Sequence, residues 1–296
     1  MNFIEQLRQK AKEHNSIVCM GMDPVLEKMP ARSSIKKTIS KFYLDILDAM
    51  KSEDVKPAMV KPNIAFYEQY GFDGLKALKS IIPKYQEAGI PVLMDAKRGD
   101  IGKTSAAYAK ALFEFWGVDA VTVAPYMGSD SVGPFIEWCE KGKGVYILTR
   151  TSNVGAVDMQ NLAVTKGSSV NGAAITTPIY MKTAEKLIEW HKPGVGSVIG
   201  ATFPRELEEI SGFFVSSGKE VPMLIPGVGA QGGTAQDVVA ALRKTNNPLE
   251  LHRINSSSGI NYAYLEEKTD DYAGAAVRAI RKLNGEIGLH RLPGIA

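Results

Sequence analysis

The sequence predicts an α/β fold of the (β/α)₈ class, a TIM barrel that forms a single domain over residues 1–296. The chain is 296 residues long, which is within the range of one such barrel. Eight short apolar runs recur along it, and segments with a helical pattern lie between them. Most of these runs are continuously apolar rather than alternating, as in strands that are covered on both faces.

The eight expected strands are spread over the whole chain, at residues 17–23, 58–66, 91–97, 120–125, 144–150, 196–202, 222–229 and 251–259. Helical periodicity is clear between them, for example at 34–51, 74–89 and 234–246. A doubly wound open sheet is the alternative fold. It usually has fewer strands, and no GxGxxG follows the first strand here.

The longest connection lies between the fifth and sixth expected strands. Residues 151–177 are rich in Ser, Thr, Asn and Gly, and a helical pattern resumes at 178–191. We therefore expect a loop insertion at about 151–177 on one barrel, rather than a domain boundary.

The composition excludes several classes of protein. No apolar run approaches the roughly 18 residues of a membrane-spanning helix, and the polar N-terminus is no signal peptide. Two cysteines, Cys19 and Cys139, are too few for a disulfide scaffold and favour a reducing cytoplasm. The net charge of +3 comes without a Lys/Arg block with interleaved aromatics. We expect a cytoplasmic protein with neither a nucleic-acid nor a membrane partner.

Charged residues gather where the third expected strand ends. Active sites of such barrels lie at the C-terminal ends of the strands. Asp95 and Lys97 are two apart on one strand, so their side chains point to the same face. Lys61 from the second strand could add a cation, and Asp100 follows a turn at Gly99. Because buried charges are costly unless paired, the order Lys–Asp–Lys–Asp offers an alternating network. A salt-bridge cluster that only caps the barrel is the alternative.

The "GKT" at 102–104 could suggest a nucleotide P-loop. The motif GxxxxGK[ST] would need glycine at position 97, which is Lys97, so the P-loop is rejected. We expect Thr104 to begin the next helix as its N-cap.

Two loops at the end of the chain are candidates for ligand binding. The loop 226–233 has four glycines, including Gly229, which let backbone N–H groups approach a ligand. The run 255–259 adds Ser257 and Ser258. Barrels often bind phosphate at the loops after strands seven and eight. A tight turn and an ordinary Ser-rich turn are the alternatives.

Metal ligation and nucleophilic serine chemistry find no support. The histidines show no metal-ligand spacing, and no GxSxG elbow is present.

Asp23 ends the first expected strand, where it could accept hydrogen bonds from sugar hydroxyls or serve as a turn residue before Pro24.

Four motifs together carry a resemblance: "KPNIAFYE", "DAKRGD", "TSN" and "PGVGAQGG". With them the chain resembles the orotidine 5′-phosphate decarboxylase family, in its longer bacterial form, over nearly its whole length. The resemblance implies a carboxy-lyase that converts orotidine 5′-phosphate to uridine 5′-phosphate (UMP) and CO₂, the last step of de novo pyrimidine biosynthesis. It also implies a homodimer of barrels with shared active sites and no metal or organic cofactor.

The resemblance further implies a role for several residues. The catalytic charge network would consist of Lys61, Asp95, Lys97 and Asp100. Asp100 would enter the partner subunit's site, and Thr104 would also reach across the dimer.

Substrate-binding roles follow from the same resemblance. Asp23 would bind ribose hydroxyls and Ser152 the pyrimidine edge. Gln231 would bridge base and phosphate as the glycine loop closes.

This sequence departs from the family pattern at the phosphate. The eighth strand usually ends with an arginine that grips the phosphate, and Ser258 stands there instead. Backbone donors of Ser257, Ser258 and Gly259 could hold the phosphate, and Arg253 is a nearby cation. A lesser departure is Ala124, where asparagine is expected.

Two other functions remain open from the sequence. The Asp-x-Lys-x-x-Asp motif is shared with a wider barrel superfamily, so a magnesium-dependent sugar-phosphate or sugar-acid lyase is one alternative. The missing phosphate arginine makes a non-catalytic nucleotide-binding barrel the other.

Overall fold

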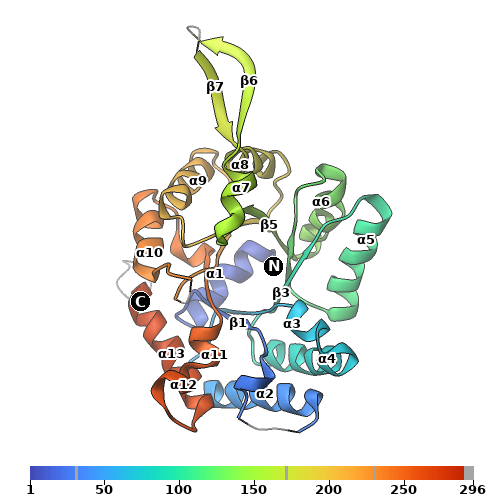
Figure 1. The fold of residues 1–296 in the computed structure, drawn as a ribbon, viewed down its shortest axis with the longest axis vertical. Coiled ribbons are helices and arrows are strands. Elements are labelled where there is room, and N and C mark those ends of the chain that lie inside the picture. The colour runs from blue at the N-terminus through green and yellow to red at the C-terminus, as the bar shows by residue number, and fades with distance from the viewer. Residues whose placement is uncertain (31–32, 171–172, 230, 290–296) are drawn as a thin grey trace.

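A closed barrel of parallel strands forms the centre of the molecule (Figure 1). The computed structural model describes residues 1–30, 33–170, 173–229 and 231–289. The barrel strands are β1 (Val18–Met22), β2 (Met59–Pro62), β3 (Leu93–Arg98), β4 (Ala120–Val123), β5 (Gly144–Arg150), β8 (Val195–Ile199), β9 (Met223–Ile225) and β10 (Arg253–Ser256). Their order is β2-β1-β10-β9-β8-β5-β4-β3, and parallel bridges Val60–Val92 and Asn63–Asp95 join the two ends. The predicted fold and all eight expected strands are confirmed.

Helices surround the barrel as a ring (Figure 1). They are α2 (Ile35–Ser52), α3 (Ala65–Glu68), α4 (Gly71–Glu87), α5 (Gly102–Lys110), α6 (Ser129–Ile136), α8 (Ile179–Glu189), α9 (Pro204–Ser216), α10 (Ala235–Lys244), α11 (Ser258–Asn261), α12 (Ala263–Glu267) and α13 (Tyr272–Ile287). Short 3₁₀ segments are η1 (Leu26–Lys28), η3 (Glu137–Lys141) and η5 (Leu249–Leu251), and a π-helical turn, η2 (Ala111–Trp116), extends α5. Their apolar faces pack on the strands, which buries both faces of the sheet and explains the continuous apolar runs.

The first helix, α1 (Phe3–Glu13), packs against the starts of the strands. Its Phe3 and Leu7 belong to one buried apolar cluster with Cys19 of β1. A side chain at Gly144, where β5 begins, would collide with the Phe3 ring. The helix therefore closes the N-terminal end of the barrel and leaves the opposite end for a site.

The insertion after β5 contains regular structure. It holds η4 (Val154–Ala156), α7 (Val157–Gln160) and an antiparallel hairpin of β6 (Ala163–Val170) and β7 (Ala173–Pro178). The hairpin projects away from the ring of helices (Figure 1). The sequence predicted the position of this insertion but not its strands, because its Ser, Thr and Gly content is also typical of loops.

The helix after β3 does not begin where expected. The chain enters α5 at Gly102, with Ile101 as the N-cap and no capping side chain. Thr104 is the third helical residue, and its backbone N–H donates to the Ile101 carbonyl. The predicted cap was wrong because Gly102 adopts a positive φ of +47°, which lets the chain turn into the helix two residues earlier.

Cys19 and Cys139 are both buried and unpaired, as their small number suggested. Among the described helices, none is long and apolar enough to cross a membrane.

Candidate active site

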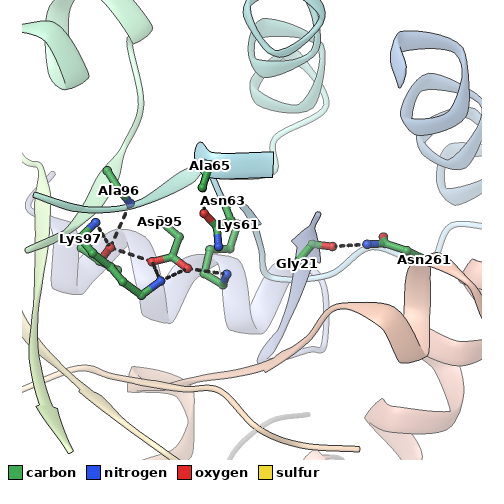
Figure 2. A network of polar contacts seen from close by, with 9 residues as sticks. Gly21, Lys61, Asn63, Ala65, Asp95, Ala96, Lys97 and Asn261 are labelled. Carbon is green, nitrogen blue, oxygen red and sulfur yellow. Dashed lines mark hydrogen bonds and ion pairs between the residues drawn. The ribbon is translucent and has the colours of Figure 1, made fainter. Parts of the chain in front are cut away.

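Three charged side chains meet at the C-terminal end of the barrel. The Asp95 carboxylate of β3 lies between two ammonium groups (Figure 2). Lys97 Nζ donates to both of its oxygens at 2.7 Å, and Lys61 Nζ of β2 donates to Oδ2 at 3.1 Å. The Asp95 and Lys61 side chains are 9% and 6% exposed, whereas that of Lys97 is 49% exposed. Lys97 is therefore the member of this network that a ligand can reach.

Burial and charge set the protonation of the inner pair. Burial alone would raise the pKa of Asp95, but the ammonium groups of Lys61 and Lys97 outweigh it and hold that pKa well below its usual range. Burial alone would lower the pKa of Lys61, but Asp95 and Asp23 outweigh it and raise that pKa. Both groups are consequently charged at neutral pH.

The backbone at Lys97 is not that of a regular strand. Its φ is +46°, in the left-handed region that a non-glycine residue seldom adopts. The pairing of β3 with β4 shifts register between Met94 and Arg98. Asp95 and Lys97 do share one site, as predicted. However, β3 bulges at this point, so the regular alternation of a strand does not by itself explain their positions. Such strain costs about 1–3 kcal/mol and is typical of functional sites.

Above the charged residues lies a cavity of about 500 Å³. Its polar lining includes Asp23, Ser152, Gln231, Ser257 and Ser258 together with Lys61, Asp95 and Lys97. Leu148, Val198 and Leu224 give it an apolar floor. A cavity of this size, mostly apolar with a few convergent polar groups, suits a small-molecule ligand.

Asp23 brings a free acceptor to this cavity. Its Oδ1 is buried and has no hydrogen-bond partner in the described structure. An unsatisfied buried carboxylate oxygen is costly, so a ligand hydroxyl that donates to it would be bound favourably.

Three predicted residues do not line the cavity. The Asp100 carboxylate accepts a hydrogen bond from the Ile101 N–H, and Thr104 is exposed on α5. The Gly229 N–H donates to the Gly233 carbonyl within its own loop.

Arg253 cannot replace the missing phosphate arginine. Its side chain is fully buried and donates to the carbonyls of Leu7, His252 and Glu250, at the closed end of the barrel. Ser257 and Ser258 do line the cavity, but the described part of its lining has no cation besides Lys61 and Lys97.

Sequence reasoning missed several lining residues, namely Asn63, Phe66, Thr122, Asn153 and Asn255. Asn255 is 5% exposed, and its Oδ1 has no partner in the described structure. Thr122 accepts from the backbone N–H groups of Ala96 and Lys97 and donates to Asp95. Both lie on strands that the sequence had identified, so a listing of inward-facing polar positions could have found them.

Within the described ranges, no group of three His, Cys, Asp or Glu side chains is placed so that it could hold a metal ion.

Comparisons with known proteins agree with this geometry. The orotidine 5′-phosphate decarboxylase / HUMPS family matches residues 16–261. The orotidine 5′-phosphate decarboxylase of Thermomicrobium roseum is 38% identical over 288 residues, which cover 95% of this chain and 94% of that protein. That of Halobacterium salinarum is 37% identical over 294 residues, covering 98% and 100%.

A solved structure shows the same similarity. The Leishmania donovani OMP decarboxylase superposes with a TM-score of 0.73 at 31% identity, covering 97% of this chain and 99% of that one. Fold, charged network and nearly full-length similarity lead to one conclusion: this chain belongs to the orotidine 5′-phosphate decarboxylase family.

Proposed function

We propose that this chain is a carboxy-lyase that converts orotidine 5′-phosphate to UMP and CO₂, the last step of de novo pyrimidine biosynthesis. The observation that carries the proposal is the Asp95 carboxylate held between Lys61 and Lys97 beneath a nucleotide-sized cavity. Relatives with this activity in their names match it over nearly their whole length. Their similar length also supports assignment to the longer form of the family.

Lys97 is the catalytic residue in this proposal. Loss of CO₂ leaves a carbanion on the pyrimidine ring with little resonance relief, so the site must stabilise that charge and protonate it. The Lys97 ammonium group is half-exposed toward the cavity and can do both, as a cation at the reacting carbon and as the proton donor. Lys61 is buried behind Asp95 and serves to hold it.

Asp95 orients Lys97 through two hydrogen bonds. A substrate carboxylate bound beside it would be repelled, and loss of CO₂ relieves that repulsion. Its low pKa supports this role, because a carboxyl that stays ionised keeps Lys97 charged and in place.

The remaining lining residues bind the nucleotide. Asp23 accepts from ribose hydroxyls, Ser152 contacts the pyrimidine edge, and Gln231 bridges base and phosphate. Ser257 and Ser258 hold the phosphate through hydroxyl and backbone donors, with the loop around Gly229 folding over it. The energy of these remote contacts is realised in the transition state.

A homodimer completes the site in this proposal. Asp100 and Thr104 do not line the cavity of their own chain, which is understandable if they serve a partner's. Large apolar side chains near them are exposed to solvent, namely Ile101, Tyr108, Tyr126 and Met127. Such residues are typical of a protein interface.

We further propose that residues 1–296 act as one unit, with the insertion at 151–177 an extension of the barrel. The two free, buried cysteines suit a cytoplasmic location.

The test is a spectrophotometric assay that follows the loss of orotidine 5′-phosphate absorbance, with and without EDTA. Equal turnover in both is expected. Activity lost to the chelator would favour the magnesium-dependent lyase, and UMP binding without turnover would favour the non-catalytic barrel.

A further inference from the structure

We infer that Thr122 is a positioning residue for this reaction: its single hydroxyl fixes both the Asp95 carboxylate and the strained backbone that presents Lys97. This inference rests on the proposed function. Thr122 lies on β4 and is 1% exposed, and it forms part of the cavity wall.

The hydrogen-bonding capacity of the Thr122 hydroxyl is fully used. A threonine hydroxyl has one donor and two acceptor sites. Oγ1 accepts from the N–H of Ala96 at 3.1 Å and of Lys97 at 3.0 Å, and it donates to Asp95 Oδ1 at 2.8 Å. The two N–H donors occupy the lone pairs, so the only hydroxyl hydrogen is directed at the carboxylate.

The two N–H groups need this partner because of the bulge. Between Met94 and Arg98 the register of β3 with β4 shifts. Thr122 Oγ1 accepts from two consecutive backbone N–H groups within this shift, those of Ala96 and Lys97. Both bonds are part-buried, so losing this partner would cost a fraction of the roughly 1–3 kcal/mol of a fully buried, unpaired N–H, and the hydroxyl stabilises this backbone to that extent. With it, φ of Lys97 is held at +46°.

The same hydroxyl fixes the carboxylate that orients Lys97 Nζ. Asp95 Oδ1 receives Thr122 and Lys97, while Oδ2 receives Lys61 and Lys97. Without Thr122, Asp95 Oδ1 keeps only its bond from Lys97 itself, so no other group fixes this oxygen and the catalytic ammonium group can shift with it. Displacements of about 1 Å can cost roughly 100-fold in rate.

The test compares Thr122→Val, which keeps the shape and removes the hydroxyl, with Thr122→Ser, which keeps the hydroxyl. For Thr122→Val we expect kcat to fall roughly 10- to 100-fold while KM and UMP affinity change little. Thr122→Ser should stay near the wild-type rate. The matched control is Thr149→Val, which removes a buried barrel hydroxyl that bonds to Ser197 and Ile147 and is not part of the cavity lining. It should leave kcat unchanged.

A second readout does not depend on turnover. Hydrogen exchange of the Ala96 and Lys97 N–H groups should be slow in the wild type and in Thr122→Ser, and faster in Thr122→Val, with the neighbouring strands still protected. If a folded Thr122→Val keeps normal kcat and normal protection, or if Thr122→Ser is as impaired as Thr122→Val, the inference is wrong. An inactive wild type would refute the proposed function alone, since the exchange comparison still decides the role of Thr122.

Discussion

Lys97 and Asp95 are joined through both carboxylate oxygens, each 2.7 Å from the ammonium nitrogen, although one side chain is half-exposed and the other is buried. An exposed cation is usually mobile, whereas this one is bonded to a carboxylate that Lys61 and Thr122 hold in place. The Lys97 ammonium group therefore has a defined position at the cavity. Such preorganisation is what electrostatic catalysis requires.

Replacing Lys97 should separate catalysis from binding. We expect Lys97→Ala to lower kcat by at least roughly 1,000-fold, because both the proton donor and the stabilising cation are lost. UMP should still bind, since the residues proposed to contact its ribose and phosphate lie elsewhere in the cavity lining. Turnover assays and calorimetric titration with UMP measure the two effects.

Lys84→Ala is the matched control for that change. Lys84 is an exposed lysine on α4 with a surface ion pair to Glu87. It should be fully active, and near-normal turnover of Lys97→Ala would refute the assigned role.

The proposed sharing of sites between subunits can be tested with hybrid dimers. Lys97→Ala and Asp100→Asn chains are each expected to be inactive alone. In a hybrid, one site combines the intact Lys97 of one chain with the intact Asp100 of the other. Random mixing should therefore restore about a quarter of wild-type activity, since half of the dimers are hybrids with one good site of two.

The control mixture combines Lys97→Ala with Asp95→Asn. Both residues belong to the same chain's network, so every site in those hybrids keeps one defect and no activity should return. Equal recovery in the two mixtures, or none in the first, would contradict a shared site.

The contrast between Lys97 and Thr122 shows how far the sequence could be interpreted. Continuous apolar runs predict the barrel, and their polar ends predict Lys61, Asp95 and Lys97, because burial forces opposite charges to pair. The sequence does not predict the bulge at Lys97, where φ is positive and the backbone N–H donates to a threonine hydroxyl on the next strand. Thr122 has the β-branched side chain that is common in any strand, so its type alone does not mark it as part of the site. The hairpin at β6 and β7 was missed for a related reason: in the described structure its strands form a separate two-stranded sheet and carry no barrel signal.

His252 predicts how stability depends on pH. Its ring is fully buried, and Nδ1 accepts from the Met223 N–H. Burial, together with the nearby charges of Arg253 and Arg8, lowers the pKa of His252 to about 3. An unfolded histidine titrates near 6.5. As the pH falls from about 6.5 toward 3, His252 becomes protonated in the unfolded state but stays neutral in the folded state. The free energy of unfolding should therefore drop by up to about 1.4 kcal/mol per pH unit because of this group.

Urea unfolding at several pH values and a fixed chain concentration measures this dependence. His252→Asn keeps an acceptor for the Met223 N–H and removes the titration. The slope between pH 5 and 6.5, where few carboxyls titrate, should become shallower in the variant. A variant with the wild-type slope would show that His252 is not the group responsible.

Ser258→Arg should strengthen substrate binding. Ser258 is exposed at the cavity edge, so a longer side chain can be accommodated there. A charge-assisted contact to the substrate phosphate should lower the KM for orotidine 5′-phosphate and the Kd for UMP roughly tenfold. Both constants should also become more sensitive to salt, because an exposed ion pair is screened.

Two controls isolate the phosphate contact in Ser258→Arg. Uridine has no phosphate, so its affinity should not change. Ser216→Arg adds the same charge on α9, outside the cavity lining, and should leave UMP binding as it is. If Ser258→Arg tightened uridine as much as UMP, or left UMP binding unchanged, the phosphate would not lie against Ser258. The donors that hold it would then have to be sought on the glycine loop after β9.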